Sequence, residues 1–391
     1  MNFFIIILMN TILISTITGI KPIVSLHSYS IGHSPQEISM IITASALFPA
    51  LLAYSIGKMI DSFGTRPMIM IGNVILIIAL WISAIYPSLI IFVVQQSMVG
   101  VASTCLMLCL QKRVGGVSGK IDRVVANYSL SGSLGAIIGP IVSSTIYDAY
   151  GFQSCIWFNI FLIILALISE LAMKNREEKQ STPKDNQKAE LENNESIWFY
   201  MRDRDLRNAI LIGALLFSSR DLFNVYFPLL AVNMGITPTL TGILLSFCGV
   251  SMLLIRFSQT ILIHFYRRMT ILTWSLYLTG FIYLIVPFSS WVPLLFVLIG
   301  LLGAGLGLGQ PLSTAAVLEA TLPERRGKIL GAQMAFNRIS QFAIPLIFGG
   351  IGGLIGISTI FWASGLVLLS SGYMTRSTKE NSPGKYSERN L

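Results

Sequence analysis

Long apolar stretches recur along the whole chain, and they constrain its fold more than any other feature. Each is about 20 residues long, enough for a helix to cross the ~30 Å hydrocarbon core of a bilayer. Of the 391 residues, 53% are hydrophobic and only 12% are charged, whereas soluble domains carry about 25% charged residues. The fold class is therefore predicted to be all-α integral membrane protein.

The stretches predict twelve transmembrane helices. The Lys and Arg residues that lie outside the predicted helices, or at their ends, are concentrated in every second loop. The other loops contain no Lys or Arg. Because basic loops stay on the cytoplasmic side, both termini are expected to be cytoplasmic. The first stretch has no basic residue ahead of it and no clear cleavage site, which favours a retained helix over a signal peptide. The predicted spans are 3–27, 36–56, 67–86, 88–110, 124–147, 153–173, 206–230, 239–263, 269–288, 291–317, 328–350 and 354–374.

The two halves of the chain look like repeats of one another. A shift of 203 residues places Gly32 on Gly235, and a shift of 205 residues places Gly151 on Gly356. Two six-helix repeats in parallel orientation indicate alternating access around a central site. The expected organisation is an N-terminal six-helix bundle at 1–173, a cytoplasmic linker at 174–205, a C-terminal six-helix bundle at 206–374 and a cytoplasmic tail at 375–391.

A polar loop, GKMIDSFGTRP, interrupts the apolar pattern at residues 57–67. Together with the helix count, the repeat and the central linker, it resembles the major facilitator superfamily, whose pattern in this loop is Gly-x-x-x-Asp-x-x-Gly-x-Arg. The resemblance implies a gating latch in which Asp61 lies against the N-terminal end of the helix expected at 328–350. The second half has His264 at the equivalent position, so the latch is expected on one side only. The matching residues are Gly57, Asp61, Gly64 and Arg66.

A second pattern of that family, Gly-x-x-x-Gly-Pro, falls in the span expected at 124–147 and consists of Gly135, Gly139 and Pro140. In the family it is associated with proton-coupled exporters of the drug or metabolite antiporter type. The same spacing also serves plain close packing of helices. The family often has an Arg four residues before Gly100, where this chain has Gln96. That difference puts the family's usual proton relay in doubt for this chain.

Ionisable residues within the predicted spans are the candidates for function. Burying one mid-membrane costs ~2.5–3.5 kcal/mol, which requires an ion-pair partner or a water-filled cavity. Asp221, deep in a span, and Glu319, near the end of one, are the candidates for proton coupling. Structural ion pairs are the alternative, and Lys21 could instead extend outward to the membrane surface. The candidate substrate-binding residues are Lys21, Arg220, Asn224, Arg256, Asn337, Arg338 and Gln341.

Other functions have little support in the sequence. The Cys and His residues show no metal-ligand spacing, no catalytic set is present, and no cofactor or nucleic-acid partner is expected. We expect a monomeric secondary active transporter in the cytoplasmic membrane of a bacterium, whose partners are a small-molecule substrate, protons and the lipid bilayer. It would export a small polar, anionic solute, such as an opine-type metallophore, by proton antiport. The alternatives are an importer of an organic anion, a multidrug exporter and a non-transporting membrane sensor.

Overall fold

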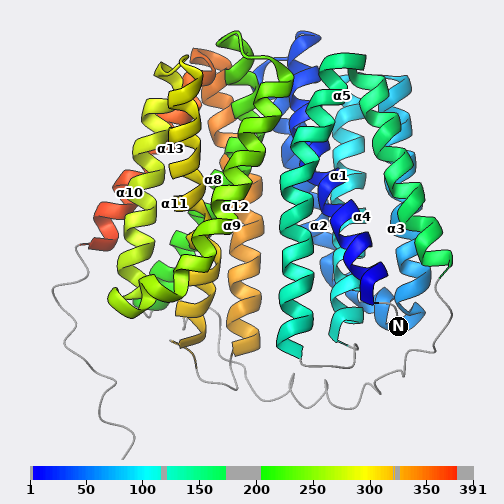
Figure 1. Cartoon of the computed structure of the whole chain (residues 1–391), viewed down its shortest axis with the longest axis horizontal. Coiled ribbons are helices and arrows are strands. Elements are labelled where there is room, and N and C mark those ends of the chain that lie inside the picture. Colours follow the sequence, from blue (N-terminus) through cyan, green and yellow to red (C-terminus); the bar gives the residue numbers. More distant parts are fainter. Residues whose placement is uncertain (1–2, 116–120, 173–203, 320, 322–325, 377–391) are drawn as a thin grey trace, which may run out of the picture. The chain divides into compact units, whose positions relative to one another are not determined.

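The computed structural model describes residues 3–115, 121–172, 204–319, 321 and 326–376 (Figure 1). The described residues are helical apart from short connections. Most of the linker expected at 174–205 and most of the tail expected at 375–391 lie outside the described residues. The helices are α1 (Phe3–Ser30), α2 (Pro35–Phe63), α3 (Thr65–Ile85), α4 (Leu89–Gly115), α5 (Ile121–Leu171), α8 (Arg204–Asn233), α9 (Pro238–Phe265), α10 (Arg268–Ile285), the 3₁₀ turn η1 (Val286–Phe288), α11 (Val292–Glu319), α12 (Arg326–Ile355) and α13 (Ile357–Arg376).

Among the described residues, eleven helices are long and apolar enough to cross a membrane. One of them, α5, contains 51 residues and has a non-helical Gly151 in its interior, with φ 80°. Figure 1 shows α5 reversing direction within its length. This break falls between the spans expected at 124–147 and 153–173, which places two predicted spans within the one helix.

Turns between helices explain several glycines of the sequence repeat. Gly32 and Gly235, which the repeat pairs, have φ values of 99° and 75°, and Gly151 and Gly356 have φ values of 80° and 120°. Side chains strongly disfavour this left-handed backbone, whereas glycine adopts it readily. The repeated glycines therefore occupy repeated turns.

The described helices belong to two compact units. Unit 1 contains residues 1–196, 221–250 and 338–357, and unit 2 contains residues 197–220, 251–337 and 358–391. Helices α8, α9 and α12 each contribute one part to each unit. Unit 1 thus combines α1 to α5 with segments from the second half of the chain.

Glycines set the close approach of α1 to α5 in unit 1. A Cβ atom at Gly135 would lie 2.5 Å from the carbonyl oxygen of Thr11, and one at Gly139 would lie 2.3 Å from that of Ser15. The carbonyl oxygen of Pro140 in turn lies 2.6 Å from the position of a Cβ atom at Gly242 on α9. The Gly-x-x-x-Gly-Pro pattern therefore packs α1 and α9 against α5, whatever its role in transport.

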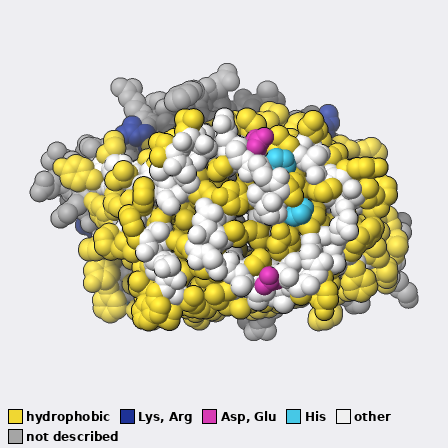
Figure 2. Space-filling model, turned by 90° about the horizontal axis from the view of Figure 1, so that it is seen from above, with side chains coloured by type: hydrophobic (Ala, Val, Ile, Leu, Met, Phe, Trp, Pro, Cys, Tyr) yellow, Lys and Arg dark blue, Asp and Glu magenta, His cyan; other side chains and the backbone are white. Residues whose placement is uncertain are grey.

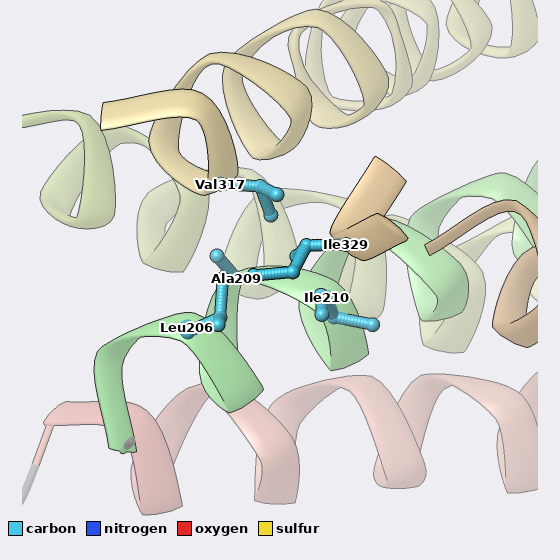
Figure 3. Packing of buried hydrophobic residues seen from close by; sticks show 5 residues of the cluster. All are labelled: Leu206, Ala209, Ile210, Val317 and Ile329. Carbon is cyan, nitrogen blue, oxygen red and sulfur yellow. The ribbon is translucent and has the colours of Figure 1, made fainter. Parts of the chain in front are cut away.

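Unit 2 has an apolar core between α8, α11 and α12 (Figure 3). Its buried members are at most 3% exposed, and Met269 and Phe336 pack against them. Apolar side chains fill the space between three helices here, as helix packing requires. The buried members are Leu206, Ala209, Ile210, Val317 and Ile329.

Candidate functional site

Asp221, on α8, lies at the centre of a charged network in unit 1. Its Oδ2 atom is 3.2 Å from Nζ of Lys21 on α1 and accepts a 2.6 Å hydrogen bond from Nε2 of Gln341 on α12. Arg338 extends the network because its Nη1 atom donates to Oε1 of Gln341 over 3.1 Å. The side chains of Lys21 and Asp221 are only 18% and 21% exposed. Three helices thus converge on one carboxylate oxygen.

Helix geometry explains which residues meet. Arg338 and Gln341 are three residues apart on α12 and therefore share a face. Arg220 and Asp221 are successive on α8 and point about 100° apart, so the partner of Asp221 comes from another helix rather than from its neighbour. Lys21 supplies the opposite charge. Its side chain pairs with Asp221 instead of extending outward to the membrane surface, the alternative that the sequence left open.

The network carries two basic groups and one acidic group. Limited exposure strengthens their electrostatic interactions relative to those in water. A proton on Asp221 would remove the charge that holds Lys21, and a ligand that takes Lys21 would leave Asp221 without its partner. Lys21 and Asp221 therefore balance each other's charge.

Within the part of the chain that the structure describes, the remaining predicted substrate-binding residues form no hydrogen bond or ion pair with this network. Asn224 is half-buried on the unit 1 segment of α8, whereas Arg220, Arg256 and Asn337 belong to unit 2. Nε of Arg256 donates to the carbonyl oxygen of Gly307 over 3.4 Å. Asn337 is 8% exposed, and among the described residues its Oδ1 atom has no hydrogen-bond partner.

Glu319, the second candidate for proton coupling, has a different environment. It ends α11 and forms an ion pair with Arg268 at the start of α10. Its side chain is 64% exposed, whereas that of Asp221 is only 21% exposed. Asp221 is the better placed of the two candidates.

The loop at residues 57–67 has well-defined contacts in unit 1. Asp61 pairs with Lys112 of α4 at 2.8 Å, and Nη2 of Arg66 donates to the carbonyl oxygen of Leu171 over 3.4 Å. Gly64, with φ 82°, separates α2 from α3, whereas a Cβ atom at Gly57 would meet nothing within 4 Å. The loop therefore connects the ends of α2, α3, α4 and α5.

Sequence reasoning missed a buried ion pair beside this loop. Arg113 donates from both terminal nitrogens to Glu170 over 2.6 and 2.7 Å, and its Nε atom donates to Thr65 over 2.8 Å. Arg113 is 6% exposed and Glu170 is fully buried. Both lie at span ends that the positive-inside pattern places on one side of the membrane, and that signal could have paired them.

Comparison with known proteins gives the family. The model of the Major Facilitator Superfamily matches residues 3–264 and 209–389. The chain belongs to this superfamily. One relative is an uncharacterized MFS-type transporter, MJ1560 of Methanocaldococcus jannaschii, 19% identical over 364 residues, which are 91% of this chain and 92% of that protein. Another, YvkA of Bacillus subtilis, is 26% identical over 164 residues, which are 40% of this chain and 36% of that protein.

Solved structures of other transporters share the fold. A mutant of the nucleoside transporter NupG gives a TM-score of 0.80 at 11% identity, covering 97% of this chain and all of that one. A POT family transporter in complex with 5-aminolevulinic acid gives a TM-score of 0.75 at 13% identity, covering 96% and 95%. This member of the superfamily is a membrane transporter and not an enzyme.

Proposed function

We propose that this transporter exports a small polar, anionic solute by proton antiport and alternating access, with Asp221 as the group that binds and releases the proton. The network of Lys21, Asp221, Gln341 and Arg338 carries this proposal. Ionisable groups within membrane-spanning helices are costly and mark proton or solute pathways. A network of this kind within membrane-spanning helices favours coupled transport over a purely structural role.

The charge of the network supports an anionic solute. Lys21 and Arg338 together outweigh Asp221, so a negatively charged solute would balance the excess. Arg338 uses one terminal nitrogen on Gln341, and the remaining donors of a guanidinium can hold a carboxylate in a two-pronged geometry. We therefore place an acid group of the solute at Arg338.

Antiport adds a second requirement, because the proton and the solute must exclude one another from the same state. A solute that carries an amine beside its acid groups satisfies this requirement. The amine would pair with ionised Asp221, the acid groups would pair with Lys21 and Arg338, and a protonated Asp221 would not hold the amine. An opine-type metallophore combines these groups and is our specific candidate. The POT family relative was solved with 5-aminolevulinic acid, which also joins an amine to an acid.

The ion pair between Lys21 and Asp221 also favours a second candidate function, uptake of an organic anion together with protons. For an anion without an amine, a proton on Asp221 would free Lys21 to bind the acid group. Proton and anion would then strengthen each other's binding, since linkage is reciprocal. Export is supported by the Gly-x-x-x-Gly-Pro pattern, so direction is the first property to measure.

We further propose twelve spans with both termini in the cytoplasm, for a monomer in the cytoplasmic membrane of a bacterium. The break at Gly151 supports two crossings within α5. On the face seen in Figure 2, acidic and His side chains are visible, and Lys and Arg atoms appear only at its margin. A face poor in basic residues agrees with its placement outside the cell. We propose that Asp61 and Arg66, in the loop at residues 57–67, act as the inner gating latch.

A deletion strain tests the proposed function. Metabolites in cells and medium are compared between the deletion strain and the same strain expressing either the wild-type protein or the Arg338→Ala variant at equal membrane abundance. Export predicts that one anionic compound accumulates inside the deletion strain, and that only the wild-type protein restores its release. Loss of uptake of an anion would instead establish the importer. Altered resistance to lipophilic cations alone would indicate a multidrug exporter, and no change in any solute would favour a sensor.

A further inference from the structure

Four helix turns lie together at one end of unit 1. The OH group of Tyr29, beside the α1–α2 turn, donates to Oδ1 of Asn233, beside the α8–α9 turn, over 3.1 Å. A Cβ atom at Gly353, beside the α12–α13 turn, would lie 3.1 Å from Cβ of Gln36 on α2. Asp148, beside the break within α5, contacts the first turn of α9. The four turns, which define the turn end of unit 1, are those of Gly32, Gly151, Gly235 and Gly356.

The charged network around Asp221 lies on helices that lead to the turn end. Beyond Asp221, α8 continues to Tyr226, which is fully buried and whose OH group contacts Ser39 on α2. Beyond Gln341, α12 continues to Gly349, where a Cβ atom would overlap the Oγ atom of Ser39. Helices from the two halves of the chain are therefore packed together between the network and the turn end.

Helices α5 and α9 form a seam between the same two halves. A Cβ atom at Gly249 would lie 3.3 Å from Cγ1 of Ile137, and one at Gly242 would lie 2.6 Å from the carbonyl oxygen of Pro140. The contacts advance along α5 toward its break while they move back along α9 toward its first residue, so the helices run antiparallel. The seam therefore ends at the turn end.

Asp148 closes the seam by capping α9. Its Oδ2 atom accepts a 2.6 Å hydrogen bond from Oγ1 of Thr239 and a 3.3 Å hydrogen bond from the backbone nitrogen of the same residue. The first N–H groups of a helix lack acceptors within the helix and lie at the positive end of its dipole, where a carboxylate is favourable. Thr237 supplies a local cap, since its Oγ1 atom accepts from the backbone nitrogen of Leu240 over 3.3 Å. Asp148 adds a second cap, and this one comes from the other half of the chain.

We propose that Asp148 and Thr239 form the lock of a gate at the turn end, through which solute passes between the Asp221 network and that side of the membrane. Asp148 is exposed and Thr239 is half-buried, so water can replace either partner when α5 and α9 part. The lock is therefore reversible. Its role as a gate rests on the proposed transport by alternating access.

Access from the turn end to a cysteine at position 224 tests the lock. Asn224 is half-buried and lies three residues beyond Asp221 on the same face of α8. A membrane-impermeant maleimide is added on whichever side of the membrane labels Ser30→Cys, because Ser30 is an exposed residue of the turn end. The native cysteines are buried, and the protein without an introduced cysteine gives the background. Loss of the lock should raise the labelling rate of Asn224→Cys about two- to fivefold.

Asp148→Ala and Thr239→Val, each combined with Asn224→Cys, should both raise the labelling rate. The two changes together should raise it no further than Asp148→Ala alone, because they remove the same contact. Glu37→Ala is the matched control, since Glu37 is also a capping carboxylate at the turn end but caps α2 within its own half, accepting from the backbone nitrogen of Ser34 over 2.7 Å. This control should leave the labelling rate unchanged.

The lock is refuted if Asp148→Ala leaves the labelling rate of Asn224→Cys unchanged, or if Glu37→Ala raises it equally. Labelling requires neither a solute nor a proton gradient. A raised rate therefore supports the lock even if the proposed export fails, and an unchanged rate leaves the export proposal standing.

Discussion

The buried ion pair between Arg113 and Glu170 allows the sharpest stability prediction. Glu170 is fully buried, and its two oxygens accept both terminal nitrogens of Arg113 over 2.6 and 2.7 Å. Glu170→Leu would leave the Arg113 charge buried without the carboxylate of Glu170, although Nε of Arg113 would keep its 2.8 Å bond to Thr65. Removing one partner of a buried pair costs about 3–5 kcal/mol, and we expect that loss in the free energy of unfolding.

The adjacent residue on α4 provides a matched control. Lys112 pairs with Asp61 at 2.8 Å, but the two side chains are 40% and 74% exposed. Exposed ion pairs contribute about 0–1 kcal/mol, so Asp61→Leu should change the free energy of unfolding by no more than that. Two ion pairs that involve successive residues of one helix should thus differ several-fold in their contribution to the free energy of unfolding.

Denaturant titration in mixed micelles, followed by circular dichroism, measures these free energies. A double variant, Arg113→Met with Glu170→Leu, should recover most of the loss, because no unpaired charge stays buried. The reasoning fails if Glu170→Leu destabilises the protein no more than Asp61→Leu does. It also fails if the double variant is as unstable as Glu170→Leu alone.

Three further predictions follow from other contacts. Gly139→Ala should destabilise the protein by about 1–3 kcal/mol, because a Cβ atom would lie 2.3 Å from a carbonyl oxygen of α1. Gly350→Ala, where a Cβ atom would meet nothing within 4 Å, should be neutral or stabilising, and equal effects of the two variants in thermal unfolding would contradict this prediction. Tyr226→Phe removes a buried hydroxyl that contacts Ser39 and the carbonyl of Pro345, and should lower the free energy of unfolding by about 1–3 kcal/mol. An unchanged free energy of unfolding would show that the hydroxyl is dispensable. Gln341→Leu removes the 2.6 Å hydrogen bond to Asp221, and the rate of transport by the folded variant should fall about tenfold or more. Transport at the wild-type rate would exclude Gln341 from the site.

Much of the fold was predictable from the sequence because hydrophobic thickness dictates helix length. Among the described residues, eleven helices are long and apolar enough to cross a membrane, where the sequence predicts twelve spans. The break within α5, at Gly151, falls between two of the predicted spans. The pairing of Gly32 with Gly235 also anticipated two turns of the same backbone type. Such signals are local, and a local pattern of apolar residues and glycines is enough to show them.

The site was only partly predictable, because its contacts join helices that are far apart in the chain. The sequence indicated that Lys21, Asp221, Arg338 and Gln341 were costly or polar residues within spans. It did not indicate that Lys21 and Asp221, 200 residues apart, would pair. That choice depends on how α1, α8 and α12 are rotated against one another, and helical periodicity does not specify rotation. The ion pair of Arg113 and Glu170 also joins two helices, and only the shared position of both residues at span ends indicated it.

The central claim is that a proton on Asp221 drives transport of the solute. The solute identified in the deletion strain is supplied to proteoliposomes whose lumen is more acidic than the medium, so that antiport would concentrate it inside. The wild-type protein should accumulate the labelled solute. Asp221→Asn should lose accumulation, because its uncharged amide neither releases a proton nor pairs with the amine of the solute, and an unchanged thermal unfolding should show that the variant is folded. If Asp221→Asn accumulates the solute in response to the pH gradient as the wild type does, Asp221 is not the coupling residue and the mechanism proposed for this transporter is wrong.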